Sequence, residues 1–508
     1  MAALILGAWA AMAPLKLHHS PECLKLGGWH DIAGALTHKG VHHVWQGCPA
    51  KGAWSHAAST DLVHWEDRGL GPSAIQETYA GMQSNSCPCS GFVTLNDDGV
   101  PCAGFRQCSS THGTTALNPQ ANKWDVPLEV RCAQDDKLTQ WGASQFLFPY
   151  YFYRALPYDP IRPWRDDDGQ WYTAISSDAC NATTRKRPCN AGGQLDLYSA
   201  PSFNGTWQKV EDAPLFTTNT SMSGKAIVDK VAIDGEFVTS DYIGGLPGDP
   251  DGGKSRVVTE NRNGAHYWVG RQQDGPGGRF TPYWERIGAV GHYDYGSLTM
   301  ARTLGGGANQ VSQKGRRVLI GWANGAPSLA AQSLPRDLSL SPQYELLQAF
   351  VPELMSLRST TAPFLHSSTL GEWLNTSSTM QLEVKAEFEY GSSSNAPFGL
   401  NVYASPDLTT STEIFVTCSA DSICACGIDA RSQGGKRITA PLLFQPGGEG
   451  HVSLHAIVDG PIIELIANNR TAMLVFTAYK NLPPAGKSGL QLFGAAVKAS
   501  MSAWELEV

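Results

Sequence analysis

From about residue 17 to residue 355, short apolar runs alternate with turn signals, and hardly any stretch has the 3.6-residue period of a helix. The turns are Asp-Gly or Asn-Gly pairs flanked by β-branched or aromatic residues, at 97–99, 167–169, 234–235, 263–264 and 274–275. Such pairs favour tight hairpin turns between antiparallel strands. The pattern therefore predicts an all-β fold with many short strands.

A faint repeat lies inside this region. Residues 57–65 and 199–207 each form a Ser-rich turn that closes on a tryptophan, Trp65 and Trp207. Repeated four-stranded units are typical of a β-propeller, in which the blades bury one another's faces around a central funnel. The repeat indicates several blades without fixing their number.

The pattern changes between residues 357 and 378, where the chain is rich in Ser and Thr and non-periodic, so we interpret it as a linker. Beyond it, residues 379–508 alternate apolar and polar positions, most clearly at Leu382, Val384, Ala386 and Phe388. Alternation of this kind predicts antiparallel strands with one solvated face, and hence a C-terminal β-sandwich. Residues 15–356 would then form the propeller.

Length and composition agree with two globular domains, since the chain has 508 residues, 42% of them hydrophobic and 17% charged. The net charge of -8, with no basic stripe, argues against a nucleic-acid partner. The sequence has no apolar run of roughly 20 residues, so we predict no membrane span.

Three features favour a secretory or vacuolar compartment. Residues 1–14 are apolar and Ala-rich, as in a signal peptide. The chain has 12 cysteines, most of them in its first 200 residues and none in paired zinc-knuckle spacing, which favours disulfides. It also carries Asn-x-Ser/Thr sequons at Asn181, Asn204, Asn219, Asn375 and Asn469.

The stretch 28–65 is the strongest candidate for chemistry. It places Asp31 just ahead of a predicted hairpin, between Trp29 and Trp45. Aromatic walls and a rigid strand end are what a sugar-cleaving carboxylate needs. The alternative is structural, because an aspartate often opens a hairpin through an Asx turn.

The same stretch resembles glycoside hydrolase family 32, which comprises invertases, inulinases, levanases and fructosyltransferases. Residues 54–65 are similar to the family's Trp-Gly-His-Ala-x-Ser-x-Asp-Leu-Val-x-Trp segment, and Asp31 and Gly34 match its Trp-Met-Asn-Asp-Pro-Asn-Gly opening. In the last domain, 454–459 and 426–432 resemble two of the family's strands. The resemblance implies a five-bladed propeller followed by a β-sandwich.

The resemblance also implies three catalytic carboxylates. Asp31 would be the nucleophile, and Asp166 would stabilise the transition state, although Asp167 replaces the proline of the family's Arg-Asp-Pro motif. The family's Glu-Cys-Pro-Asp-Phe motif is absent, so Glu236 is the candidate acid/base, with Glu260 in reserve. The three aspartates at 166–168 could instead only build a turn, and Glu236 could be an exposed surface residue.

Five further residues are implied in substrate binding, and each could instead belong to the core. Gln46 and Trp54 would grip the fructosyl unit, Arg165 would keep a neighbouring carboxylate ionised, and Ser90 and Asp294 match other family segments.

No metal or organic cofactor is expected. The early histidines lack zinc-site spacing. Residues 248–255 satisfy the P-loop expression, but a proline and two acidic residues make it unsuitable for phosphate.

The leading hypothesis is a secreted retaining glycosidase that hydrolyses β-fructofuranosidic bonds in sucrose or fructans by double displacement, with fructosyl transfer as an open outcome. Two alternatives stay open: a propeller glycosidase acting on arabinan or xylan, and a catalytically inactive glycan-binding relative. Oligomeric state and chain-length preference are left undetermined.

Overall fold

The computed structural model describes most of the chain. The residues described are 15–21, 23, 31–73, 86–109, 128–147, 160–178, 193–210, 215–217, 239–260, 265–273, 275–305, 315–325, 330–376, 380–391, 396–419, 423–444, 450–478 and 487–507. They form two compact units. One comprises Pro21–Tyr293 and Thr299–Leu347, and the other Met1–Ser20, Asp294–Leu298 and Gln348–Val508. We call them the propeller unit and the sandwich unit.

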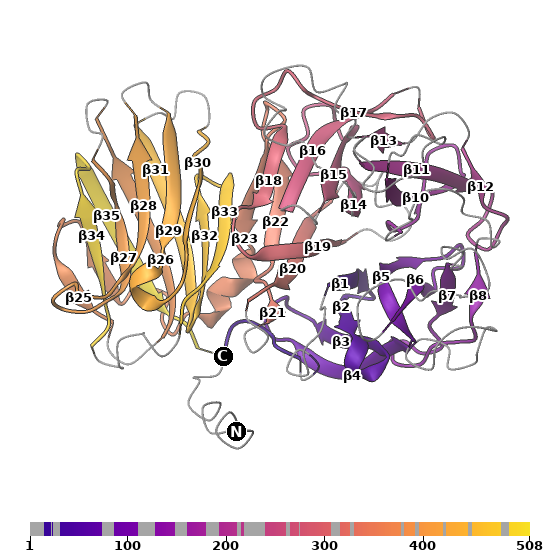
Figure 1. The fold of residues 1–508 in the computed structure, drawn as a ribbon, viewed down its shortest axis with the longest axis horizontal. Coiled ribbons are helices and arrows are strands. Elements are labelled where there is room, and N and C mark those ends of the chain that lie inside the picture. The colour runs from indigo at the N-terminus through magenta and orange to yellow at the C-terminus, as the bar shows by residue number, and fades with distance from the viewer. Residues whose placement is uncertain are drawn as a thin grey trace. The chain divides into compact units, whose positions relative to one another are not determined.

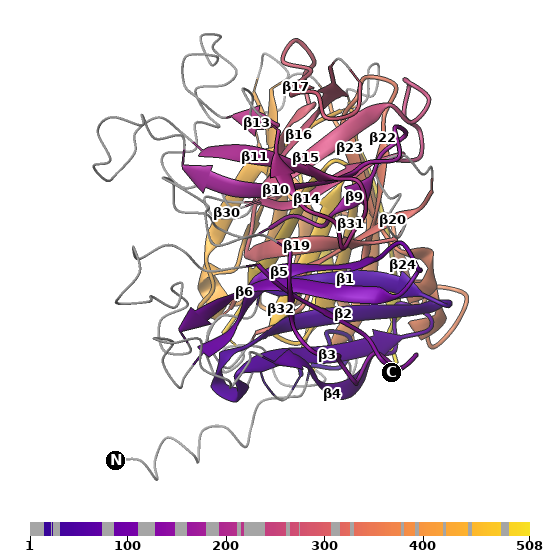
Figure 2. The same cartoon turned by 90° about the vertical axis from the view of Figure 1, so that its right-hand side faces the viewer.

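The propeller unit begins with two four-stranded antiparallel sheets made of consecutive strands. The first contains β1 (Ile32–His38), β2 (Val41–Cys48), β3 (Ala53–Ser59) and β4 (Glu66–Ser73), with a 3₁₀ turn, η3 (Pro49–Lys51), between β2 and β3. The second contains β5 (Ser86–Leu95), β6 (Pro101–Ser109), β7 (Glu129–Cys132) and β8 (Gln145–Phe146). Figure 2 shows β1 to β4 side by side.

Three further sheets follow in chain order (Figure 1). The third contains β9 (Trp164–Arg165), β10 (Trp171–Asp178), β11 (Gly193–Ala200), β12 (Gln208–Lys209) and β13 (Phe216–Thr217). The fourth contains β14 (Thr239–Gly244), β15 (Ser255–Glu260), β16 (Ala265–Gln272), β17 (Phe280–Pro282) and β18 (Val290–Asp294). The fifth contains β19 (Leu298–Leu304), β20 (Arg317–Ala323), β21 (Ala331–Gln332), β22 (Arg336–Leu340) and β23 (Leu346–Phe350).

Successive sheets bury apolar faces against each other, as blades do. The first and second sheets share a core that contains Trp54 and Phe105, whose rings are 5.3 Å apart. Phe92 and Trp171 lie in a core between the second and third sheets. Residues of the third and fourth sheets likewise share a cluster. The all-β prediction is confirmed, and five sheets match the predicted number of blades, which itself stays a prediction.

The sandwich unit has two six-stranded antiparallel sheets. One runs in the order β24 (Leu365–Ser367), β35 (Lys498–Glu505), β26 (Gln381–Glu389), β31 (His451–Asp459), β32 (Ile462–Ala467) and β33 (Thr471–Phe476). The other runs in the order β25 (Trp373–Asn375), β34 (Gly489–Gly494), β27 (Phe398–Ala404), β28 (Thr412–Cys418), β29 (Cys424–Asp429) and β30 (Arg437–Pro441). Two 3₁₀ turns, η6 (Pro352–Leu357) and η7 (Arg431–Gln433), accompany them.

Alternation along β26 predicted the inward face of this sandwich. Leu382, Val384, Ala386 and Phe388 all lie in its core cluster. The stretch 357–378 differs from the predicted linker, because it contains β24 and β25, which pair with β35 and β34. Each of these strands has only three residues, which is too short for a period of two to be recognised.

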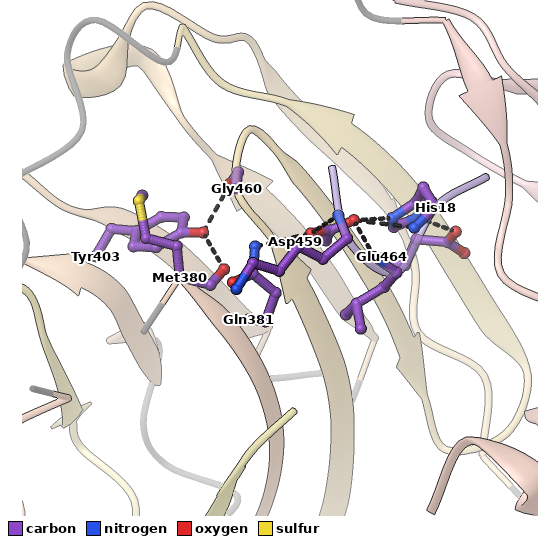
Figure 3. Close-up of polar contacts among 9 residues, drawn as sticks. His18, Met380, Gln381, Tyr403, Asp459, Gly460 and Glu464 are labelled. Atoms are coloured by element: carbon purple, nitrogen blue, oxygen red, sulfur yellow. Dashed lines mark hydrogen bonds and ion pairs between the residues drawn. The ribbon is translucent and has the colours of Figure 1, made fainter. Parts of the chain in front are cut away.

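The segment around His18 is anchored inside the sandwich unit. The Nδ1 atom of His18 lies 2.9 Å from Asp459 Oδ2, and its Nε2 atom lies 3.0 Å from Glu464 Oε1 (Figure 3). The backbone N–H groups of Leu17 and His18 also donate to Asp459, each at 3.0 Å. Gln381 donates to the other oxygen of Asp459. All three ionisable side chains are fully buried, so each depends on the others for its partners.

Candidate active site

Asp31 precedes β1 directly, at a place where the β1–β2 ladder is irregular. The hairpin closes at Lys39 and Gly40, whose φ angles of 50° and 79° suit a type I′ turn. At its far end the register shifts between Ile32 and Gly34, which indicates a β-bulge. Bulges re-aim side chains and are frequent beside active sites. The carbonyl of Asp31 still accepts a hydrogen bond from the Gly47 amide at 3.0 Å.

The Asp31 carboxylate meets the second sheet at Ser90. The buried Ser90 hydroxyl donates to Oδ2 of Asp31 at 2.7 Å. A close approach of β1 to β5 makes this possible, since a Cβ atom at Gly34 would lie only 2.6 Å from Cγ2 of Val93. The structure thus brings together two of the predicted site residues.

Arg302 reaches the same place from β19, and the sequence analysis missed it. Its Nε donates to the Ile32 carbonyl at 3.2 Å, and its Nη2 donates to the Gly91 carbonyl at 2.8 Å. The guanidinium is buried and joins the residues that follow Asp31 and Ser90. An arginine as the single charged residue of a predicted strand was the available signal.

Burial and charge act oppositely on Asp31. Desolvation raises the pKa of its carboxyl above the ordinary value, while the Ser90 hydrogen bond and the positive charge of Arg302 lower it. Desolvation prevails, so the pKa of Asp31 is raised. Ser90 and Arg302 therefore favour the ionised form of Asp31, which a nucleophilic role would require.

Asp166 follows β9 and lies in a tight turn. Its side chain is buried and accepts a hydrogen bond from the Asp167 amide at 2.9 Å. The Gly169 amide donates to its carbonyl, and Gly169 has a φ of 77°. The carboxylate thus takes part in the turn, as the structural alternative anticipated.

Arg165 points to the solvent-exposed side, since successive strand residues face opposite ways. Its Nε donates to the Gly169 carbonyl at 3.1 Å, and its Nη1 is 3.9 Å from Asp97 Oδ1. The first contact ties Arg165 to the turn and the second approaches the connection between β5 and β6, and neither of them reaches Asp166.

Gln46 and Trp54 lie on β2 and β3 and are buried. Gln46 is paired with Ile32, next to Asp31. Trp54 is fully enclosed in the core between the first two sheets, and its indole N–H donates to the Cys89 carbonyl at 3.0 Å. A ring held in this way has no exposed face on which a sugar could stack.

The other predicted residues divide into three cases. Asp294 belongs to the sandwich unit, where its Oδ1 accepts the amides of Gly296 and Leu474 at 2.7 and 3.2 Å. Glu236 lies outside the described residues. Glu260 is the last residue of β15, paired with Thr239 and His266, and its side chain lies outside the description.

A buried polar cluster joins the third, fourth and fifth sheets. Asp241 of β14 accepts hydrogen bonds from the Thr303 amide at 3.1 Å and hydroxyl at 2.6 Å. Arg162, ahead of β9, donates to the Thr303 carbonyl at 2.7 Å and lies 3.9 Å from Asp241. Arg302, on the same strand β19, donates to carbonyls of the first and second sheets. Together these contacts link all five sheets near Asp31.

Among the described residues, no three His, Cys, Asp or Glu side chains gather as a metal site would require. The described part of the chain also contains no helix with the length and apolar character of a membrane span.

Comparisons with known proteins agree on one family. The "Glycosyl hydrolases family 32 N-terminal domain" matches residues 27–350, and "Glycosyl hydrolases family 32 C terminal" matches residues 353–505. The chain is 24% identical to the "Beta-fructofuranosidase, insoluble isoenzyme 2" of Oryza sativa subsp. indica over 94% of this chain and 88% of that protein. It is 22% identical to the "Fructan 1-exohydrolase" of Hordeum vulgare over 76% of this chain and 67% of that protein.

Solved structures show the same fold. Fructan 1-exohydrolase IIa from Cichorium intybus has a TM-score of 0.74 at 18% identity and covers 97% of both chains. An exo-inulinase from Aspergillus awamori has a TM-score of 0.71 at 18% identity, with 97% of this chain and 98% of that chain covered. The propeller followed by a sandwich is therefore confirmed, and the chain belongs to glycoside hydrolase family 32.

Proposed function

We propose that this glycoside hydrolase cleaves β-fructofuranosidic bonds in sucrose or fructans with retention of configuration. The observation that carries the proposal is the Asp31 carboxylate, held by Ser90 at the junction of β1 and β5 and flanked by the Arg302 charge. Relatives named as β-fructofuranosidases and a fructan 1-exohydrolase support this substrate class. A related Cichorium intybus structure, in complex with 1-kestose, has a TM-score of 0.74.

The reaction would take two displacements. Asp31 attacks the anomeric carbon of the fructosyl unit while Glu236 protonates the leaving glycosidic oxygen. Glu236 then deprotonates a water molecule, which attacks the same carbon, releases fructose and restores the Asp31 carboxylate. Asp166 would hydrogen-bond the sugar hydroxyls. Ser90 holds Oδ2 of Asp31, so Oδ1 is the atom we assign to the attack.

Purified protein should be incubated with sucrose, inulin and levan, and released fructose should be measured. Asp31→Ala should lower turnover by several orders of magnitude while the circular dichroism spectrum stays unchanged. Ser55→Ala is a matched control, because Ser55 is a small buried residue of β3 whose hydroxyl donates a long hydrogen bond, 3.4 Å, to the Gln46 carbonyl. Equal activity of Asp31→Ala and wild type would refute the assignment.

The same assay separates the alternatives. Release of arabinose from arabinan, with no fructose released from the fructosides, would show that the enzyme is the arabinan-acting alternative. Binding of sucrose or inulin without release would favour an inactive glycan-binding relative. We retain both because the family's Glu-Cys-Pro segment is absent from the sequence.

Glu236→Gln tests the acid/base. Its turnover of sucrose should fall at least about a hundredfold, while fructosides with good leaving groups should lose much less, since they need no proton. Full activity on sucrose would remove Glu236 from the mechanism, and Glu260→Gln would then be the next variant.

Secretion is part of the proposal. Three sequon asparagines are exposed in the structure, namely Asn204, Asn375 and Asn469, as glycan attachment requires. One relative is named as a cell wall isozyme. Expression in a secreting eukaryotic host should give a protein whose mass falls on treatment with peptide-N-glycosidase.

A further inference from the structure

The Cys23–Cys48 disulfide lies close to the candidate nucleophile in the covalent structure. It joins residues 25 apart in sequence, and Asp31 lies within the loop that it closes. Both cysteines are buried. Cys48 is the last residue of β2, directly after Gly47.

Gly47 connects this disulfide to Asp31. The Gly47 amide donates the 3.0 Å hydrogen bond to the Asp31 carbonyl. Because the β1–β2 register shifts between Ile32 and Gly34, Asp31 lies beyond the regular part of the ladder. The position of its backbone therefore depends on strand-end contacts such as this hydrogen bond more than that of a residue inside the ladder would.

Strand ends are where local opening begins. The end of β2 is paired with β3 through Gly47 with Trp54 and Cys48 with Ala53, and β2 then passes into the turn η3. The disulfide at Cys48 restrains this end of β2 covalently. An error of about 1 Å in a reacting group can cost on the order of a hundredfold in rate.

We propose that the Cys23–Cys48 disulfide is a positioning element for Asp31, which fixes the end of β2 so that the Gly47 amide holds the nucleophile in its reactive place. The proposal rests on the proposed function. Losing the bond lowers kcat beyond what its loss of stability explains, and leaves KM nearly unchanged.

The test compares two double variants. Cys23→Ala/Cys48→Ala removes the positioning disulfide. Cys102→Ala/Cys132→Ala removes the disulfide between β6 and β7, whose residues are 30 apart. Similar loop lengths predict a similar loss of stability in both variants, which makes the second a matched control.

Kinetics should be measured on sucrose well below both melting temperatures. We expect kcat of the Cys23→Ala/Cys48→Ala variant to fall at least about tenfold, with KM within about threefold of wild type. The Cys102→Ala/Cys132→Ala variant should keep kcat within about twofold. Equal kcat values in the two variants would overturn the proposal.

Hydrogen exchange gives a readout that does not need activity. The peptide 41–48, which contains the Gly47 amide, should exchange at least about tenfold faster without the Cys23–Cys48 bond and at the wild-type rate in the control. Unchanged exchange would contradict the proposal even if sucrose and fructans are not substrates. If Cys23→Ala/Cys48→Ala does not fold, Cys23→Ala/Cys48→Val refills the space and undergoes both measurements.

Discussion

At the scale of single residues, the ionisation of Asp31 is set by a balance between burial and two polar neighbours. Desolvation raises the pKa of its carboxyl, and Ser90 and Arg302 favour the ionised form. A nucleophilic carboxylate must be ionised, so activity should be lost as pH falls through this raised pKa. The Ser90 hydroxyl is the simpler of the two neighbours to remove.

Ser90→Ala should raise the pKa of Asp31 further, because it deletes a hydrogen bond that the ionised form accepts. A hydrogen bond to a charged group contributes about 1.5–3 kcal/mol, so at acid pH kcat/KM should fall about tenfold or more beyond any loss at neutral pH. The measurement is a pH profile of kcat/KM on sucrose, in which the acid limb moves to higher pH.

Thr94→Val is the matched control for this prediction. Thr94 lies on the same strand β5, is fully buried, and donates to the Pro163 carbonyl at 3.3 Å. Its loss should cost about 1 kcal/mol of stability and leave the acid limb in place. An acid limb at the wild-type position in Ser90→Ala would show that this hydroxyl does not tune Asp31.

Sequence motifs singled out Asp31 and Ser90 because both lie in segments whose residue order resembles the family, and the structure joins the two by a hydrogen bond. They could not reveal that Trp54 is buried, since enclosure depends on how the second sheet packs on the first. Arg302 was missed for a related reason. Its partners are backbone carbonyls of Ile32 and Gly91, roughly 200 residues or more away in the chain, and no local pattern encodes such a contact.

At the scale of elements, two histidines are packed against Trp45, which lies in the core that the first and second sheets share. Nδ1 of His43 on β2 lies 2.9 Å from Nε2 of His56 on β3. Trp45 stacks on both rings, with ring centres 5.7 and 4.7 Å away. Burial, with repulsion from nearby positive groups that include Arg68, lowers the pKa of His43 to about 4 and that of His56 to about 3.

These shifts make the packing of β2 and β3 sensitive to acid. A histidine with a lowered pKa stays neutral in the folded state, while the unfolded chain takes up a proton below about pH 6.5. The stability that neutral His43 and His56 contribute is therefore present above pH 6.5 and is lost as pH falls toward 4. The melting temperature of wild type should fall steeply between pH 6.5 and 4.5.

A His43→Phe/His56→Phe variant should flatten this dependence, because phenylalanine keeps an aromatic ring against Trp45 and does not titrate. Thermal melts at several pH values provide the measurement, and the slope is compared with that of His366→Gln, a change at an exposed histidine. If the double variant retains the full wild-type slope, the acid sensitivity arises elsewhere.

At the scale of the whole molecule, the sequence correctly predicted a β-propeller followed by a β-sandwich. Turn pairs and alternation suffice for an all-β chain that ends in a sandwich, because both signals are local. The division of the chain is not local: Asp294–Leu298, which runs from the last residue of β18 to the first residue of β19, belongs to the sandwich unit, and Met1–Ser20 does so as well. In the sandwich unit, Ser297 donates its amide to the Leu474 carbonyl at 2.7 Å, a pairing that no sequence period announces.

The stabilities of the two units should respond to pH in opposite directions, because their buried histidines have pKa values shifted in opposite directions. Burial alone would lower the pKa of His18, but its hydrogen bonds to Asp459 and Glu464 raise it to about 9.

A raised pKa means that the stability gained from charged His18 is fully present below about pH 6.5 and is lost as pH rises through 9, by on the order of 3 kcal/mol. Scanning calorimetry should thus show the sandwich transition move down between pH 7 and 9.5, while the propeller transition moves down on acidification. His18→Gln should melt lower at pH 7 and lose the alkaline shift, whereas His366→Gln should keep it. A wild-type sandwich transition that stays constant up to pH 9.5 would show that His18 is not charged in the folded protein.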